Sequence, residues 1–172
     1  MVDVVGILLI AAEQGHVSAQ YYLGVVFAEG KGVKQDNGEA VRWYLKAAEQ
    51  GHVNAQQNLG VLYADGNGVK QDFDEAVRWM RKAAGQGDVD AHFKLGTLFH
   101  NGQGTKQDYK EAVRWYRLAT ELGHADAQAI LGVMYKQGQG AKQDYKEAVR
   151  WYRKAAEQGN VQAQLGAMFT KA

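Results

Sequence analysis

The 172-residue chain contains no cysteine and no proline, and its charges nearly cancel. Without cysteine it cannot form a disulfide bond, a thiolate metal site or an iron–sulfur cluster, although this absence does not identify the cellular compartment. The 20 Lys and Arg residues against 19 Asp and Glu residues give a net charge of +1, so no general attraction to nucleic acid or to an anionic membrane is expected. No apolar stretch is long enough to predict a membrane span.

Glycine, in contrast, is abundant, with 21 residues, yet no Gly- or Ser-rich linker interrupts the chain. The sequence instead repeats every 36 residues, which indicates a repeat architecture. All four tryptophans occupy one position of the repeat: Trp43, Trp79, Trp115 and Trp151. We therefore expect a single solenoid domain over residues 1–172, with half-repeats over 1–14 and 159–172 and four full repeats over 15–50, 51–86, 87–122 and 123–158.

Each repeat is expected to form two helices. A Gly-x-Gly sequence, residues 30–32 in repeat one, ends the first helix, because glycine permits the left-handed backbone of a helix C-terminus. The second helix is predicted to start at an Asp with a Glu three residues later, as in Asp36 and Glu39, which is a capping-box pattern. One hairpin cannot bury its own apolar face, so stacked hairpins should form an all-α solenoid. The predicted N-caps of the first helices are Ser18, Asn54, Asp90 and Asp126.

The repeat unit reads A-x-x-x-L-G-x-x-(F/Y)-x-x-G-x-G-V-x-Q-D-x-x-E-A-V-R-W-Y-x-K-A-A-E-Q-G. This unit resembles the Sel-like repeat, a relative of the tetratricopeptide repeat. The tetratricopeptide repeat has a period of about 34 residues and a characteristic proline, whereas this chain has a longer period, no proline and a Gly-x-Gly between the helices. The resemblance covers residues 5–170 and implies a tetratricopeptide-like α/α superhelix that serves as an adaptor, often in bacteria.

Function is expected where the four repeats differ, because shared positions maintain the fold. The first helices keep their core positions but vary on one face, and the resemblance implies that this face lines a concave groove. Aromatic residues dominate interface hot spots, so Tyr21, Tyr22 and Phe93 are candidate anchors, with packing between repeats as the alternative for Tyr22 and Phe93. The predicted partner-binding residues are Tyr21, Tyr22, Glu29, Asn58, Asp65, Phe93, Lys94, His100, Asn101, Ile130, Lys136 and Gln137.

No pattern indicates a catalytic or metal site. His16, His52 and His124 recur at one repeat position and are too far apart to share a metal, because packed helices lie about 8–10 Å apart. His92 and His100 are separated by about 12 Å along one helix. The Gly-x-Gly sequences lack the preceding strand of a phosphate loop, and each recurring Arg follows a Glu by three residues, so ion pairing accounts for it. We expect no enzyme, no cofactor, no metal and no nucleic-acid partner.

Neither end of the chain shows the polar cap that solenoids normally have. Residues 1–14 align with a second helix but are apolar nearly all round; a signal peptide is the alternative, although a charged leading region and a typical cleavage site are missing. Residues 165–169 match residues 131–135 with two residues fewer before them, which predicts a shortened or shifted last helix. One hypothesis is self-association through these uncapped ends, with pairing to flanking chain as the alternative.

The main functional prediction is a non-enzymatic scaffold that binds a protein or peptide in the groove of the first helices. The alternative is a module of an exported bacterial protein that binds a polysaccharide or cell-wall fragment on aromatic platforms such as Tyr21 and Phe93. A third hypothesis is the hydrolase activity proposed for cysteine-rich relatives, which this cysteine-free chain resembles less well. Periplasmic, secreted and cytoplasmic locations are all compatible with the sequence.

Overall fold

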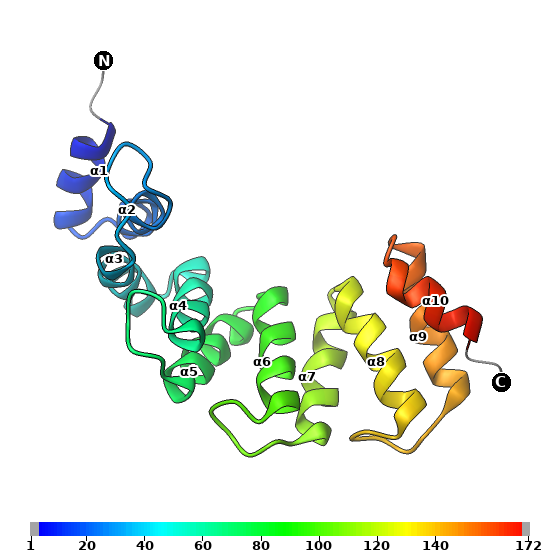
Figure 1. Ribbon diagram of the computed structural model, residues 1–172. Helices are drawn as coiled ribbons and strands as arrows, with labels where there is room; N and C mark the ends of the chain where they lie inside the picture. The colour runs from blue at the N-terminus through cyan, green and yellow to red at the C-terminus, as the bar shows by residue number, and fades with distance from the viewer. Residues whose placement is uncertain (1–3, 170–172) are drawn as a thin grey trace. The chain divides into compact units, whose positions relative to one another are not determined.

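The computed structural model describes residues 4–169, which form ten α-helices and no strand. This confirms the all-α prediction, and consecutive helix pairs pack as a repeat solenoid. The chain divides into two compact units, Met1–Asp88 (unit 1) and Val89–Ala172 (unit 2), and each is described by itself. In both units every helix packs on the next helix along the chain (Figure 1).

Unit 1 contains one helix followed by two hairpins. Helices α2 and α3 form the first hairpin and α4 and α5 the second, while α1 packs on α2 and α3 packs on α4. The helices are α1 (Val4–Glu13), α2 (Val17–Glu29), α3 (Asn37–Glu49), α4 (Val53–Asp65) and α5 (Phe73–Gly85).

Unit 2 contains two hairpins followed by one helix. Helices α6 and α7 form one hairpin and α8 and α9 the other, α7 packs on α8, and α10 packs on both α9 and α8. The helices are α6 (Val89–Asn101), α7 (Tyr109–Glu121), α8 (Ala125–Gln137), α9 (Tyr145–Glu157) and α10 (Val161–Phe169).

The first helix of each repeat begins earlier than predicted. The predicted caps Ser18, Asn54, Asp90 and Asp126 all lie inside the first turn, so that prediction was wrong. The N-caps of α2, α4 and α8 are instead His16, His52 and His124. The Nδ1 atom of His52 accepts a hydrogen bond from the backbone N–H of Ala55 at 3.3 Å, and His124 does the same for Ala127 at 3.2 Å. The usual N-cap residues are Ser, Thr, Asp and Asn, so the sequence gives no cap signal at these histidines.

The second helices begin where the Asp residues predict. The Oδ1 atom of Asp36 accepts from the N–H of Glu39 at 3.0 Å, as an N-cap should. The capping box is only half formed, however, because the N–H of Asp36 donates to the carbonyl of Phe27 at 2.9 Å. Glu39 pairs instead with Arg42 at 3.0 Å. The bond from Asp36 to Phe27 fastens the start of α3 to α2, and the same bond recurs in the other three repeats.

Glycine lets the two helices of a hairpin approach closely. A Cβ atom on Gly24 would lie 2.5 Å from Cδ1 of Tyr44, and one on Gly132 would lie 2.6 Å from Cδ1 of Tyr152. Both distances are too short for non-bonded carbon atoms, so only glycine allows this packing. The predicted glycine C-cap is also confirmed, since Gly30 follows α2 with φ of +69° in the left-handed region.

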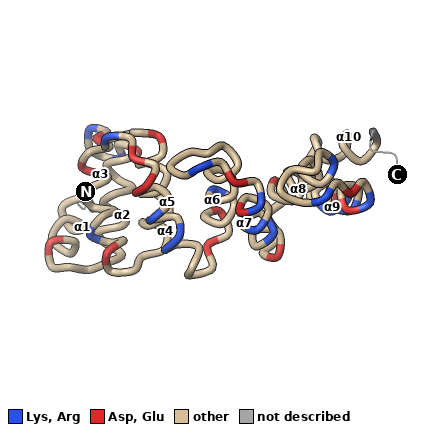
Figure 2. Tube along the Cα trace, turned by 90° about the horizontal axis from the view of Figure 1, so that it is seen from below, with Lys and Arg blue, Asp and Glu red and all other residues tan. Residues whose placement is uncertain are grey.

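The recurring tryptophan packs in the core of unit 1 and is half-buried in unit 2, and charged side chains lie over its ring. Trp43 and Trp79 are buried, and the ammonium of Lys46 lies 4.2 Å from the ring centroid of Trp43. The predicted Glu–Arg pairs are present, and residues of both signs adjoin on α7 and α9 (Figure 2). The nitrogen–oxygen distances are 3.0 Å for Arg42–Glu39, 2.7 Å for Arg78–Glu75, 3.4 Å for Arg114–Glu111 and 3.1 Å for Arg150–Glu147.

The terminal helices expose apolar side chains. On α1, Val4, Ile7 and Ile10 are exposed, and on α10 Val161 and Met168 are exposed. Helix α10 is described over Val161–Phe169, and the predicted shortening or shift of the last helix stays a prediction, because the residues that follow lie outside the described part of the chain. None of the helices within residues 4–169 combines the length and the hydrophobicity that crossing a membrane requires.

Candidate functional site

The predicted partner-binding residues lie on α2 and α4 in unit 1 and on α6 and α8 in unit 2; we name each set the first-helix face of its unit. Every one of these residues is at least partly exposed, so all remain available for contact. The first-helix face of unit 1 comprises Tyr21, Tyr22, Glu29, Asn58 and Asp65. That of unit 2 comprises Phe93, Lys94, His100, Asn101, Ile130, Lys136 and Gln137.

Two of the three candidate aromatic anchors pack between consecutive repeats. The Tyr21 ring stacks on the imidazole of His52, with centroids 4.3 Å apart and planes at 18°. The equivalent ring, Phe93, stacks on His124 at 4.3 Å and 16°. One face of each ring is therefore covered by the histidine that caps the next first helix.

Tyr22 is placed differently. Its side chain is 56% exposed, and its only ring neighbour among residues 4–169 is Tyr21, with centroids 5.4 Å apart. Packing between repeats therefore does not account for Tyr22. An exposed tyrosine next to a second aromatic ring provides a large contact area with a polar tip, which suits an interface.

Beneath this surface, Tyr44 of α3 and Asn58 of α4 form a side-chain hydrogen bond. Burial raises the pKa of Tyr44 to about 12, and the bond to Asn58 acts in the opposite direction. The Tyr44 hydroxyl is thus protonated at neutral pH. Asn58 is partly engaged in holding α3 against α4, which leaves fewer of its polar groups for a partner.

In unit 2 the equivalent tyrosines differ in their hydrogen bonds. The Tyr116 hydroxyl donates to Oγ1 of Thr97 at 3.2 Å. Tyr152 is 4% exposed, yet its hydroxyl has no hydrogen-bond partner among residues 4–169. Burial raises the pKa of both tyrosines, so both hydroxyls remain protonated at neutral pH. The Tyr152 side chain lines a cavity of about 370 Å³ between α8 and α10.

The two first-helix faces have opposite charge. Unit 1 presents Glu29, which pairs with Lys31, and the exposed Asp65. Unit 2 presents Lys94 and Lys136, and neither lysine forms an ion pair within the described part of the chain. Each unit would therefore favour a partner segment of opposite charge.

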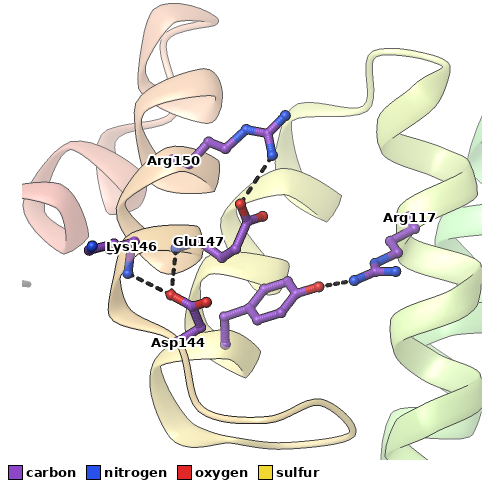
Figure 3. A network of polar contacts seen from close by, with 6 residues as sticks. Arg117, Asp144, Lys146, Glu147 and Arg150 are labelled. Atoms are coloured by element: carbon purple, nitrogen blue, oxygen red, sulfur yellow. Dashed lines mark hydrogen bonds and ion pairs between the residues drawn. The ribbon is translucent and has the colours of Figure 1, made fainter.

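A second cleft of unit 2, of about 450 Å³, lies along α7 and was not predicted from the sequence. Lys110, Arg114 and Arg117 line it, with Glu121 as the acidic residue. Arg117 donates to the hydroxyl of Tyr135, which holds its guanidinium toward α8 (Figure 3). The repeat pattern gave no signal for this cleft, because it depends on how α7 packs against the loop after α8.

The described residues provide no metal site. No group of three or more His, Cys, Asp or Glu side chains within residues 4–169 is placed to hold a metal ion. Burial lowers the pKa of His52 and raises the pKa of Tyr63, and both residues lie in packing contacts. Such shifts follow from the fold and do not indicate catalysis.

Known structures with this architecture are similar along most of the chain. A protective antigen present in uropathogenic Escherichia coli strains, displaying an SLR fold, is 43% identical with a TM-score of 0.91 over 93% of this chain and 34% of its own. A Sel1 repeat protein from Oxalobacter formigenes is 45% identical with a TM-score of 0.84 over 90% of this chain and 63% of its own. Helicobacter pylori cysteine rich protein B is 26% identical with a TM-score of 0.60 over 78% of this chain and 97% of its own.

The chain thus spans about a third of the antigen and less than two thirds of the Oxalobacter protein. No protein of curated function matches it in sequence. Sel1 repeat proteins are in general scaffolds for protein interactions, and their fold is typically non-catalytic. The Sel1 repeat matches this chain four times, at residues 17–52, 53–88, 89–124 and 125–160. The chain therefore belongs to the Sel1 repeat family.

Proposed function

We propose that this chain is a non-enzymatic scaffold that binds a protein or peptide through the first-helix faces of its units. The observation that supports it most directly is Tyr22, a tyrosine that is 56% exposed on a helix whose core contacts are satisfied without it. Large exposed aromatic side chains are typical anchors of protein interfaces. The four repeats share the same helix packing beneath each first-helix face. The residues that vary on these faces would therefore determine which partner binds.

The charges of the two faces indicate the chemistry of that partner. Glu29 and Asp65 on unit 1 favour a basic segment, and Lys94 and Lys136 on unit 2 favour an acidic one. Charge complementarity of this kind mainly increases the association rate and is weakened by salt. Each face is therefore expected to bind its own kind of segment.

The proposal is tested with peptides selected from a random display library on the wild-type chain. The dissociation constant of each selected peptide is then measured by calorimetry for the double variant Tyr22→Ala/Lys94→Ala. The matched control is Tyr145→Ala/Lys142→Ala, because Tyr145 is 45% exposed and Lys142 is exposed, but both lie outside the first-helix faces. We expect at least a tenfold loss of affinity for the first variant, an unchanged affinity for the control, and unchanged helical content for both.

Equal affinities of the two double variants would contradict this placement of the site. Binding of soluble cell-wall oligosaccharides, with no peptide selected, would support the polysaccharide-binding alternative, for which Tyr22 is the exposed ring. Turnover that a single substitution abolishes would support the hydrolase hypothesis.

A second candidate is self-association through the terminal helices. Ile7 and Ile10 of α1 are 57% and 61% exposed, and Met168 of α10 is 73% exposed. Exposed apolar residues that adjoin on one helix commonly mark an interface. Sedimentation velocity at high micromolar concentration should detect a species larger than the monomer, and Ile7→Glu/Ile10→Glu should abolish it. A strict monomer would contradict this candidate.

A further inference from the structure

The cavity between α8 and α10 combines apolar walls with three polar residues. Ile130 and Val133 of α8 and Leu165 of α10 line it, and Val133 and Leu165 are 39% and 48% exposed. The polar residues that line it are Lys136 of α8, Tyr152 of α9 and Gln162 of α10. Its volume of about 370 Å³ falls within the range of about 300–1,000 Å³ that is common for ligand sites.

The Tyr152 ring is buried, while its hydroxyl remains accessible and forms no hydrogen bond within the described residues. Its ring packs between two glycines, since a Cβ atom on Gly132 would lie 2.6 Å from it and one on Gly166 would lie 2.8 Å from it. In the other repeats that have this tyrosine, its hydroxyl forms a hydrogen bond with a neighbouring side chain. Tyr44 is bonded to Asn58 and Tyr116 to Thr97.

Repeat four lacks both kinds of partner. The residue 36 positions after Thr97 is Val133, which has no hydroxyl, and the residue 108 positions after Asn58 is Gly166, which has no side chain. A hydroxyl without a protein acceptor can donate to an acceptor in the cavity, and such a bond contributes modestly to binding. The space next to Tyr152 is the cavity itself.

Lys136 determines which charge on a ligand would fit the cavity. It forms no ion pair within residues 4–169, and no carboxylate lines the cavity with it. Lys136 lies six positions after Ile130, which is about 9 Å along α8. An extended peptide covers that length in about three residues. A carboxylate two or three residues from an aliphatic side chain would therefore reach Lys136 while the aliphatic group fills the apolar part.

We propose that the cavity binds an acidic, aliphatic peptide segment. A Leu- or Ile-like side chain of the segment packs against Ile130, Val133 and Leu165. A main-chain carbonyl of the segment accepts a hydrogen bond from the Tyr152 hydroxyl, and a Glu or Asp side chain pairs with Lys136. This site deepens the proposed function, on which it rests, by naming the chemistry that unit 2 recognises.

The proposal is tested with nine-residue peptide mixtures, acetylated and amidated at their ends, whose flanking positions are randomised. One mixture has the core Leu-X-Glu, a second has Leu-X-Lys and a third has Ser-X-Glu. Fluorescence anisotropy with the full chain should give at least tenfold tighter binding for Leu-X-Glu than for either other core. Equal binding of the three mixtures, or tighter binding of a peptide with a free C-terminal leucine carboxylate, would overturn the proposal.

Two hydroxyl variants separate recognition from folding. Tyr152→Phe keeps the ring between the two glycines and removes only the donor, so affinity for Leu-X-Glu should fall about five- to tenfold, as for one lost hydrogen bond. Tyr116→Phe is the matched control, because that hydroxyl already donates to Thr97, and it should leave affinity unchanged. Val133→Thr should also weaken binding, because it gives Tyr152 the partner that Thr97 gives Tyr116. Unchanged affinity in both Tyr152→Phe and Val133→Thr would overturn the role of the hydroxyl.

The charge is tested by reversing it. Lys136→Glu should exchange the preference, so that Leu-X-Lys binds more tightly than Leu-X-Glu, whereas Lys142→Glu, on an exposed loop residue, should not. If neither variant changes the preference, the assignment of Lys136 is wrong. Failure of all three mixtures while library-selected peptides still depend on Tyr22 would overturn this cavity and leave the proposed function standing. If the mixtures fail and the library-selected peptides do not depend on Tyr22 either, the proposed function is overturned as well.

Discussion

The imidazole of His52 lies flat against the Tyr21 ring, with centroids 4.3 Å apart, while its Nδ1 atom caps α4 through the N–H of Ala55. One side chain thus joins a residue of the first-helix face to the start of the next first helix. The cap requires Nδ1 to be unprotonated, because only then can it accept a hydrogen bond. Stacking and capping together explain why a histidine occupies this position.

The first prediction is a pH dependence of stability that arises from His52. Burial lowers the pKa of His52 below its ordinary value of about 6.5, so the unfolded chain binds the proton more readily. The contribution of His52 to the free energy of unfolding is therefore complete above a pH of about 6.5. It is lost as the pH falls through the lowered folded-state pKa. In urea unfolding, the free energy of unfolding of the wild type should be lower at pH 5 than at pH 8. This decrease should be smaller in His52→Asn.

Asparagine is the matched replacement, since Asn160 occupies the equivalent position and accepts from the N–H of Ala163 at 3.0 Å. It keeps the cap and cannot titrate. A difference in free energy of unfolding between wild type and His52→Asn that is the same at both pH values would contradict the prediction.

The second prediction concerns the glycine contact inside a hairpin. Gly24→Ala should destabilise the chain, because overpacking costs about 1–3 kcal/mol and its Cβ would meet the Tyr44 ring at 2.5 Å. Gly85→Ala is the control, since nothing lies within 4 Å of its Cβ at the end of α5, and it should stabilise by about 0.5–1 kcal/mol. Urea unfolding measures both, and a destabilised Gly85→Ala beside an unaffected Gly24→Ala would refute this account of the packing.

A third prediction follows from the buried glutamines that join consecutive repeats. Gln56 donates to the carbonyl of Ala48 at 3.0 Å and accepts from Nε2 of Gln86 at 2.8 Å. Gln56→Leu removes both bonds and should cost about 1–3 kcal/mol in the free energy of unfolding. Gln137→Leu, at an exposed position of α8, should change it by less than about 0.5 kcal/mol. Similar values for the two variants would show that the glutamine bonds contribute little.

The fourth prediction is that the Asp caps determine where the second helices begin. The Oδ1 atom of Asp72 accepts from the N–H of Glu75 at 3.1 Å, so Asp72→Ala should cost about 0.5–2 kcal/mol. Asp74→Ala, two residues later in the first turn of α5, removes an exposed charge but no cap and should cost less. Far-UV circular dichroism during thermal unfolding ranks the two variants, and the reverse order would be incompatible with the cap.

The repeat period predicted the helix pairs, the Asp caps and the glycine turns, because each follows from residues close together in sequence. The histidine caps could not be predicted in this way. An imidazole acts as a cap here because an aromatic ring, Tyr21 or Phe93, packs against it from the preceding first helix, and that contact is tertiary. The sequence placed these two rings among the anchors without showing that each has a covered face.

The repeat pattern did not predict the cavity beside Tyr152 either. Ile130 and Lys136 were predicted as surface residues, but nothing local to them indicates an open space. The space depends on a glycine, Gly166, facing a tyrosine of another helix. The Tyr152 hydroxyl lacks a side-chain partner there because Val133 has no hydroxyl, unlike Thr97. Comparing the repeats for missing hydrogen-bond partners would have found it, whereas comparing them for aromatic residues did not.

The central claim is that partners bind on the first-helix faces, and chemical-shift mapping tests it most directly. The ¹⁵N-labelled chain is titrated with a peptide selected from the random display library. The account predicts that the largest shifts belong to surface residues of α2, α4, α6 or α8, with Tyr22 or Lys136 among them. Shifts confined to the second helices α3, α5, α7 and α9 would contradict it.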